Sequence, residues 1–563
     1  MSTTNPVNSG EPSDRDARLD RSNAIRRNVR AVISVVVIFL AVLAPGLISS
    51  GSALALIRIP LESVLALVIL AVHPWPVARR IVGILISIIF VTSIVSSALD
   101  RGFTTAVGQL FNIVTGWPEL VDAYGVLRDS TGPVAAVAIL VLLLLASAVA
   151  ALVVAVAFLH LASMIRRHYH AGLIGGSAIT ATWIVLGLVG AQIVPGEPIA
   201  AADTISTAVA KINQVTTAAA EQTAFDNAGT TDGYAHLPTS DILTGLKGKD
   251  VIIAFIESYG QVAVQNTFFS KGVDTVLRKG NKELAADGYS ERSAFLTSST
   301  FGGMSWLAHS TLQTGLWIDS QQKYNQVTTG SRFTLSGAFK KAGWRTVSDV
   351  PSDTKPWPLG TSFYHFDTEL NSQNVGYQGP SFSYAPIPDQ YTWEYFQKHE
   401  LAKPHKPLMA EIDFVSSHTP WTPLPHEVPW ASVGNGSIFD PQPAEGLPPS
   451  IVWQSPHHVQ QLYGQSVQYT MSMLFSFLTT YNNPNLVLVV LGDHQPATEV
   501  SGAGANHNVP ISIISKDPTV INRISSWHWT PGMLPSPTAP VWRMDAFRNR
   551  FLTAYGLTNP RNQ

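Results

Sequence analysis

The stretch VIIAFIESYG, residues 251–260, decides the fold of the C-terminal half of this chain. Its apolar, β-branched run ends abruptly at Glu257, which is typical of a buried parallel strand. A second stretch, LVLVVLGDHQP at residues 486–496, repeats the pattern and ends in Asp493 and His494. Because ligands of open α/β sheets bind beyond the carboxyl ends of the strands, we expect these three side chains to converge. Two carboxylates and an imidazole suit Mn²⁺, Mg²⁺ or Zn²⁺; the alternative is that each carboxylate is a helix cap or an ion-pair partner.

The composition separates a lipid-facing part from this α/β part. The chain has 563 residues, enough for more than one domain, with 46% hydrophobic and only 13% charged residues. Soluble proteins carry about a quarter charged residues. The net charge of −2 argues against nucleic-acid binding, and the absence of cysteine excludes disulfides, thiolate metal sites and catalytic thiols.

The apolar residues gather in the first two hundred positions. Residues 1–30 carry six arginines and four acids, and we predict a disordered cytoplasmic tail. Residues 31–195 contain five apolar segments, each long enough to cross a bilayer: 31–50, 53–73, 79–98, 133–163 and 172–194. Basic residues flank alternate ends of these segments, so the positive-inside rule places the N-terminus in the cytoplasm and the chain after about residue 195 outside. A cleaved signal peptide is not expected, because the first apolar run starts late and more follow.

Two features of this membrane part allow two interpretations each. Arg58 and Glu62 stand four residues apart in an apolar segment, so they are either a functional intramembrane pair or a self-satisfied pair near the outer interface. The loop around Trp117 has apolar residues at helical spacing. It suits a helix lying in the membrane interface or an ordinary extracellular helix.

Residues 196–248 are predicted to be a partly helical linker, and residues 249–563 one α/β domain. Within this domain, SSTFGGMSWLAHSTLQTGLW (298–317) places paired glycines before a stretch with helical spacing. Backbone N–H groups and the helix dipole favour phosphate at such a helix start. Ser305 stands there, where a nearby metal would lower the pKa of its hydroxyl and make it a nucleophile. The alternative is that Ser305 is an ordinary N-cap.

The order of these motifs resembles the alkaline phosphatase/sulfatase superfamily. With five helices in front, the chain is similar to the lipoteichoic acid synthase branch, the membrane phosphoglycerol transferases. The resemblance implies a multi-pass membrane protein with an extracellular, sulfatase-like α/β domain. It further implies one divalent ion, with Mn²⁺ favoured over Mg²⁺ or Zn²⁺, held by Glu257, Ser305, Asp493 and His494, with Ser305 as the nucleophile.

Three further residues take a role from this resemblance. VSSHTPW (415–421) is similar to the family's Ser/Asn-His-x-Pro segment, which implies that His418 contacts the substrate phosphate. Trp357 echoes a Trp-Asn-Arg pocket segment, although no arginine follows it, and His507 in HNVP is a further substrate-binding candidate. A solvated loop histidine and a structural tryptophan are the alternatives. The chain also departs from the branch in having Ser at position 305 in place of Thr, and His309 where Glu is frequent.

The resemblance implies transfer of a phosphorylated head group, glycerol phosphate from phosphatidylglycerol foremost. The donor would be an anionic phospholipid of the bilayer and the acceptor a cell-envelope glycopolymer or glycolipid. A phosphoethanolamine transferase is the alternative, although such enzymes usually carry disulfides. A sulfatase lacks support, because the Cys/Ser-x-Pro-x-Arg modification motif is missing around Ser305. From a different class, a non-catalytic envelope protein could bind lipid head groups.

Overall fold

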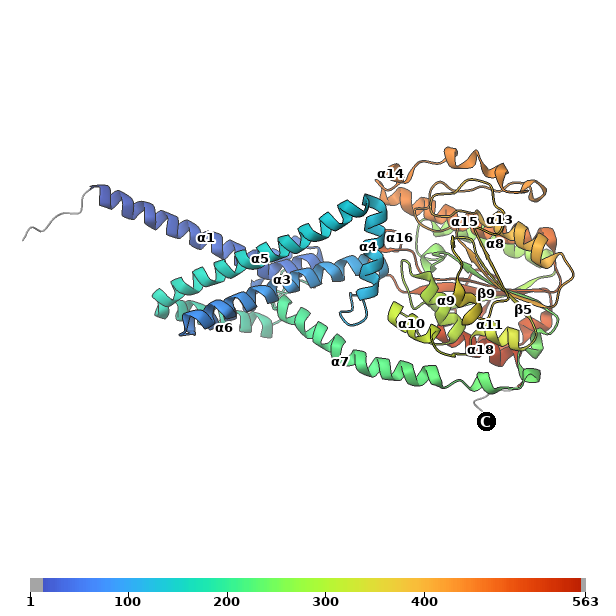
Figure 1. The fold of residues 1–563 in the computed structure, drawn as a ribbon, viewed down its shortest axis with the longest axis horizontal. Coiled ribbons are helices and arrows are strands. Elements are labelled where there is room, and N and C mark those ends of the chain that lie inside the picture. The colour runs from blue at the N-terminus through green and yellow to red at the C-terminus, as the bar shows by residue number, and fades with distance from the viewer. Residues whose placement is uncertain (1–13, 558–563) are drawn as a thin grey trace, which may run out of the picture. The chain divides into compact units, whose positions relative to one another are not determined.

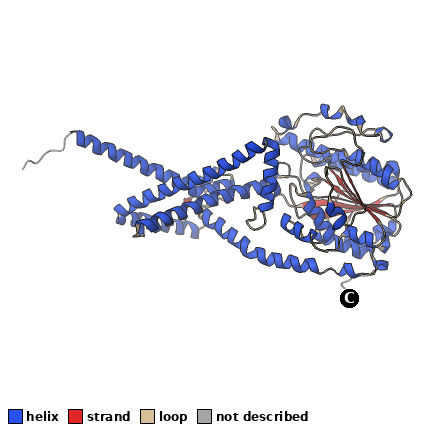
Figure 2. Ribbon diagram, in the orientation of Figure 1, coloured by secondary structure: helices blue, strands red, loops and turns tan. Residues whose placement is uncertain are grey.

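The computed structural model describes residues 14–557. Contacts divide the chain after Thr217 into two compact units, and the segment 103–109 is counted with the second. The first unit is helical and the second contains a large β-sheet (Figures 1 and 2). The predicted combination of an apolar helical part with an α/β domain is therefore confirmed.

Seven α-helices begin in the described residues of the first unit. They are α1 (Asp14–Ser50), α2 (Leu61–Val72), α3 (Pro76–Val107), α4 (Trp117–Thr131), α5 (Pro133–Arg167), α6 (Tyr169–Leu188) and α7 (Asp203–Thr230). Among the described residues, four helices are long and apolar enough to cross a membrane: α1 from Ile25, α3, α5 and α6.

The prediction of five spanning helices is therefore corrected at the second segment. A 3₁₀ turn (Ala53–Ile57) and the two-residue strand β1 (Ile59–Pro60) interrupt it, and α2 has only 12 residues. Such a helix is about 18 Å long, against a hydrocarbon core of about 30 Å. Pro60 explains the interruption, because proline has no N–H to continue a helix begun before it.

The predicted disorder of residues 1–30 is also corrected. Residues 14–30 are the first turns of α1, and they contain neither Gly nor Pro but several good helix formers. The remainder of that predicted segment, residues 1–13, lies outside the described residues.

Arg58 and Glu62 do not pair with each other. Arg58 contacts the carboxylates of Glu197 and Asp203, the latter at 3.3 Å. Glu62 accepts a hydrogen bond from the Thr204 backbone N–H at 3.0 Å, at the start of α7. Arg58 and Glu62 therefore both bind the segment that follows α6. The Glu62 carboxylate also interacts favourably with the positive N-terminal end of the α7 dipole.

The second unit is built on a nine-stranded sheet. Its order is β10-β4-β9-β8-β3-β7-β5-β6, and β11 pairs with β4. The strands from β8 to β6 run parallel, whereas β9 is antiparallel to both of its neighbours. The bounds are β3 Asp250–Ile256, β4 Ser290–Thr297, β5 Arg345–Val350, β6 Thr368–Asn371, β7 Leu408–Phe414, β8 Leu486–Gly492, β9 Asn508–Ser515, β10 Thr530–Pro531 and β11 Val541–Arg543.

Helices cover both faces of this sheet (Figure 1). Alternate residues of β3 enter two separate cores. Ile252 packs with α8 (Ser270–Ala286) and α15 (Pro456–Tyr481) on one face. Ile253 packs with α9 (Ser305–Thr314), α11 (Leu335–Lys341) and α18 (Asp545–Tyr555) on the other. A strand buried on both faces must be apolar throughout, which explains its unbroken hydrophobic run. The helices of this unit are α8 Ser270–Ala286, α9 Ser305–Thr314, α10 Gln321–Thr328, α11 Leu335–Lys341, α12 Pro358–Ser362, α13 Asp389–Phe396, α14 Pro449–Val452, α15 Pro456–Tyr481, α16 Thr498–Ser501, α17 Pro518–Asn522 and α18 Asp545–Tyr555.

The predicted linker 196–248 divides between the two units. The helix α7 occupies residues 203–230 of it, in agreement with the helical stretch that the sequence indicates. The part after it is integrated into the second unit, because Tyr234, Leu243 and Leu246 are buried in the core beneath α9 and α18. The α/β unit therefore starts before residue 249.

Candidate active site

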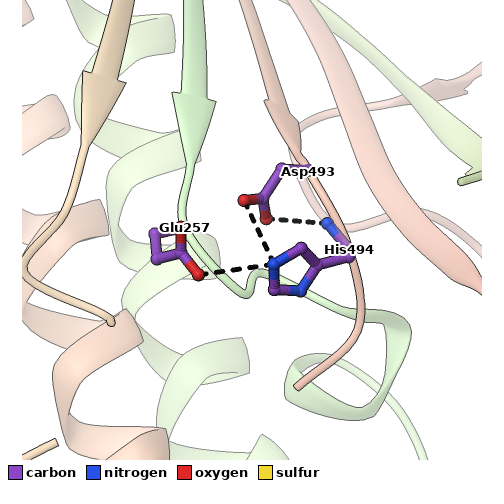
Figure 3. A group of neighbouring side chains, drawn as sticks. All are labelled: Glu257, Asp493 and His494. Atoms are coloured by element: carbon purple, nitrogen blue, oxygen red, sulfur yellow. Dashed lines mark hydrogen bonds and ion pairs between the residues drawn. The ribbon is translucent and has the colours of Figure 1, made fainter. Parts of the chain in front are cut away.

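The carboxylates of Glu257 and Asp493 lie side by side at the carboxyl edge of the sheet (Figure 3). The reason is the strand register: β3 and β8 are parallel neighbours with Ile256 opposite Gly492, so the residues that follow each strand meet. Gly492 permits this close approach, because a Cβ there would lie 2.0 Å from the Tyr259 carbonyl oxygen.

The imidazole of His494 completes a compact group with these carboxylates. Its Nε2 lies 3.5 Å from Glu257 Oε1 and 3.5 Å from Asp493 Oδ2. The ligand atoms of the three residues all lie within 4.8 Å of one another, and His494 and Asp493 are each 1% exposed. These distances suit several ligands that share one ion.

Hydrogen bonds with backbone groups fix the orientation of Asp493 and His494, the two residues that follow β8. Asp493 Oδ1 accepts hydrogen bonds from the Ser258 and His494 N–H groups at 2.8 and 2.7 Å, which leaves Oδ2 facing Glu257 and His494. His494 Nδ1 donates to the Gln495 carbonyl at 2.8 Å. That bond fixes the tautomer in which Nε2 carries a free lone pair toward the centre, as a metal-ligating histidine requires.

Ser305 adds a hydroxyl to the same centre from the first position of α9. Its Oγ lies 3.1 Å from Glu257 Oε2 and 3.2 Å from His494 Nε2. The N-cap of α9 is Met304, not Ser305, and no side chain caps this helix end. The N-cap interpretation of Ser305 therefore does not describe its hydroxyl, which bonds to the acidic centre.

The charges of the centre fit a divalent cation. Burial raises the pKa of Glu257, but its neighbours, His418 foremost, outweigh that effect and lower the pKa. Burial and the Glu257 carboxylate raise the pKa of Asp493. Two buried carboxylates in contact repel each other, and a divalent ion at their shared face removes that repulsion. The donor set of carboxylate, imidazole and hydroxyl suits Mn²⁺ or Zn²⁺.

A cavity of about 330 Å³ opens from this centre. His418 and Trp357 both line it, as does Ser305. The His418 ring stacks on Tyr384 with 3.6 Å between centroids, and Trp357 packs against Tyr364. The sequence did not single out Tyr384. His507 is not among the described residues that line the cavity; its ring lies against Phe301, with 5.2 Å between centroids.

Sequence reasoning also missed two carboxylates in this cavity, Glu411 and Asp413 of β7. They lie 3.4 and 3.5 Å from His309 Nδ1. A signal for them exists, because two acids two residues apart in an otherwise apolar strand point to the same side.

Comparison with known proteins gives structural matches alone. No family model and no curated protein sequence matches the chain. The full-length phosphoethanolamine transferase A of Neisseria meningitidis is 12% identical over 92% of this chain and 95% of its own, with a TM-score of 0.40. The lipoteichoic acid synthase LtaP of Listeria monocytogenes is 13% identical over 60% and 78%, with a TM-score of 0.33. A Vibrio parahaemolyticus protein of the alkaline phosphatase superfamily is 15% identical over 60% and 76%, with a TM-score of 0.37.

The Vibrio parahaemolyticus protein is described as a member of the superfamily that the sequence motifs resemble. The matched structures include a lipoteichoic acid synthase and a phosphoethanolamine transferase, so the comparison does not choose a head group.

Proposed function

We propose that this protein is a membrane-anchored phosphotransferase that moves a phosphorylated head group from a phospholipid to a cell-envelope glycopolymer or glycolipid. The observation that carries the proposal is the position of the Ser305 hydroxyl, within 3.2 Å of two of the three metal-ligand candidates and on the wall of a cavity. A nucleophile, an ion site and room for a substrate are the parts that phosphoryl transfer needs.

In this mechanism a divalent ion, Mn²⁺ foremost, would be held by Glu257, Asp493, His494 and Ser305, and when bound it supplies electrostatic stabilisation to the phosphoryl oxygens. Ser305 Oγ attacks the phosphorus of the lipid head group, and the bond between phosphorus and the diacylglycerol oxygen breaks. The serine proton is transferred to the departing diacylglycerol. An acceptor hydroxyl then attacks the phosphoserine, its proton returns to Ser305, and the head-group phosphate leaves on the acceptor.

The remaining residues of the cavity would hold the head group. His418 lines the same cavity as Glu257 and would contact the phosphate. For the head group itself we propose glycerol phosphate, because Ser352 and Asp353 offer hydrogen-bonding oxygens for a polyol and Trp357 offers a flat apolar face. Ethanolamine phosphate is the second candidate, because the described residues that line the cavity include five acids and no Lys or Arg.

The decisive experiment supplies purified full-length protein with phosphatidylglycerol or phosphatidylethanolamine, each labelled in the head group, with Mn²⁺ and without acceptor. We expect diacylglycerol release with phosphatidylglycerol and a labelled phosphate ester on Ser305, located by mass spectrometry. Label on Ser305 from phosphatidylethanolamine alone would replace the head group in the proposal. Diacylglycerol release without any label on Ser305 would refute the covalent mechanism.

The proposed orientation places the N-terminus in the cytoplasm and the α/β unit outside, as the arginine distribution indicates. A reporter that is active only outside the cytoplasm, fused after the last residue, is expected to be active. Activity of a cytoplasm-specific reporter at the same position would contradict this orientation.

A further inference from the structure

A second group of metal-ligand side chains lies in the same cavity, outside the centre described above. It consists of His309, Glu411 and Asp413. Glu411 and Asp413 project from the same face of β7, and His309 stands one helical turn after Ser305 on α9. The three ligand atoms lie within 4.8 Å of one another.

Partners outside the group hold its members in position. The buried Gln313 side chain donates a hydrogen bond to Glu411 Oε2, which leaves Oε1 facing His309. Gln313 is fixed in turn, because its Oε1 accepts from the Ser336 N–H at 2.9 Å. The His309 ring stacks on Phe255, with 3.8 Å between centroids and 14° between planes. Outer partners that orient a carboxylate and an imidazole in this way are usual behind metal ligands.

One oxygen of the group is buried without a hydrogen bond. Asp413 Oδ1 lies 3.5 Å from His309 Nδ1 and accepts no hydrogen bond from any described residue. A buried carboxylate oxygen without a donor is costly. The single proton on His309 Nδ1 can be donated fully to Glu411 or to Asp413, but not to both carboxylates at once.

We infer that His309, Glu411 and Asp413 bind a second divalent cation, Mn²⁺ or Zn²⁺. Donor atoms 3.4–3.5 Å apart match two ligands that each lie about 2.0–2.5 Å from one ion. Mixed nitrogen and oxygen donors select these metals over Ca²⁺. The inference is independent of the phosphotransfer proposed above, since it concerns ion binding alone.

The test counts ions on the intact, detergent-solubilised chain. Protein stripped with chelator is titrated with Mn²⁺, and bound Mn²⁺ is measured by equilibrium dialysis and by electron paramagnetic resonance. We expect two ions per wild-type chain, and one in each of His309→Gln, Glu411→Gln and Asp413→Asn. Asp493→Asn is expected to lose the ion of the first centre and to keep the second, which separates the two sites.

Asp349→Asn is the matched control. Asp349 is a buried carboxylate on the neighbouring strand β5, opposite Ile412, and one of its oxygens also lacks a hydrogen bond. It does not line the cavity, so this variant should keep two ions. A wild-type count of one that Asp413→Asn leaves unchanged would overturn the inference. So would a second ion that persists in all three variants of the group, provided that their unfolding temperatures show them folded.

Discussion

Replacing Ser305, the first residue of α9, is expected to reduce turnover much more than it reduces the free energy of unfolding. Ser305→Ala removes one hydroxyl, whose single proton is shared between Glu257 at 3.1 Å and His494 at 3.2 Å. One such donated hydrogen bond is worth about 0.5–1.5 kcal/mol, which sets the expected stability cost. The cost has no capping contribution, because Met304 occupies the N-cap.

Turnover should fall far more than stability. If Ser305 is the nucleophile, its loss removes the bond-forming atom, and such losses reach the order of 10⁶-fold in turnover. Ser305→Thr should retain activity, because threonine supplies a hydroxyl at the same place. The assay measures diacylglycerol release from head-group-labelled lipid in mixed micelles, with lipid binding measured separately.

Ser455→Ala is the control that matches the stability loss. Ser455 is a true N-cap, since its side chain accepts a hydrogen bond from the His458 N–H at the start of α15. Its replacement should cost about 1 kcal/mol and leave turnover intact. The reasoning is refuted if Ser305→Ala stays within tenfold of wild-type turnover, or if Ser455→Ala loses as much activity.

Three further outcomes follow from the described contacts. Burial and the nearby Glu400 raise the pKa of Asp349 to about 7. A raised folded-state pKa means that stability is full below the unfolded pKa, near 3.9, and is lost as pH rises through about 7. Asp349→Asn should therefore raise the unfolding temperature at pH 8.5 and change it little at pH 4; an equal shift at both would contradict this. Arg548 is fully buried and lies 2.8 Å from Asp232, whose carboxylate also lies 3.3 Å from Arg332. Arg548→Met should therefore cost about 1.5–3 kcal/mol in chemical unfolding, the range for a lost hydrogen bond to a charged group; a cost below 1 kcal/mol would disagree. Chelation should lower the unfolding temperature of wild-type protein, since an ion at a hundred times its Kd stabilises by about 2.7 kcal/mol, but should lower it less in Asp493→Asn.

The strand ends could be predicted because a strand that is buried on both faces is apolar throughout, so the first polar residue marks its end. The apolar runs of β3 and β8 set the positions of Glu257 and Asp493, and the carboxyl-edge rule gave their common direction. The sequence did not give the strand order 8-3-7, which makes the two residues immediate neighbours. That order depends on long-range pairing, for which a single sequence carries no local signal.

Composition alone also misjudged the second apolar segment. Hydropathy averages over a window, whereas the helix is broken locally at Pro60 and by the ion pairs of Arg58. Glu411 and Asp413 went unnoticed for a related reason. Their spacing in an apolar strand is a local signal, but the His309 side chain that faces them comes from a helix far away in the sequence.

The backbone around the centre argues against a degenerate, merely binding protein. Ser258, directly after Glu257, and Met304, directly before Ser305, both have positive φ angles, of 56° and 62°. Each such residue costs roughly 1 kcal/mol or more relative to glycine, which adopts this region freely. The strain has a use, because the turn at Ser258 directs its N–H to Asp493 Oδ1. Backbone strain of this kind gathers at sites where side chains must be held for chemistry. Two of the nine described non-glycine residues with positive φ thus flank the first metal-ligand candidate and the candidate nucleophile, as the proposed phosphotransferase requires of side chains that must be held in place.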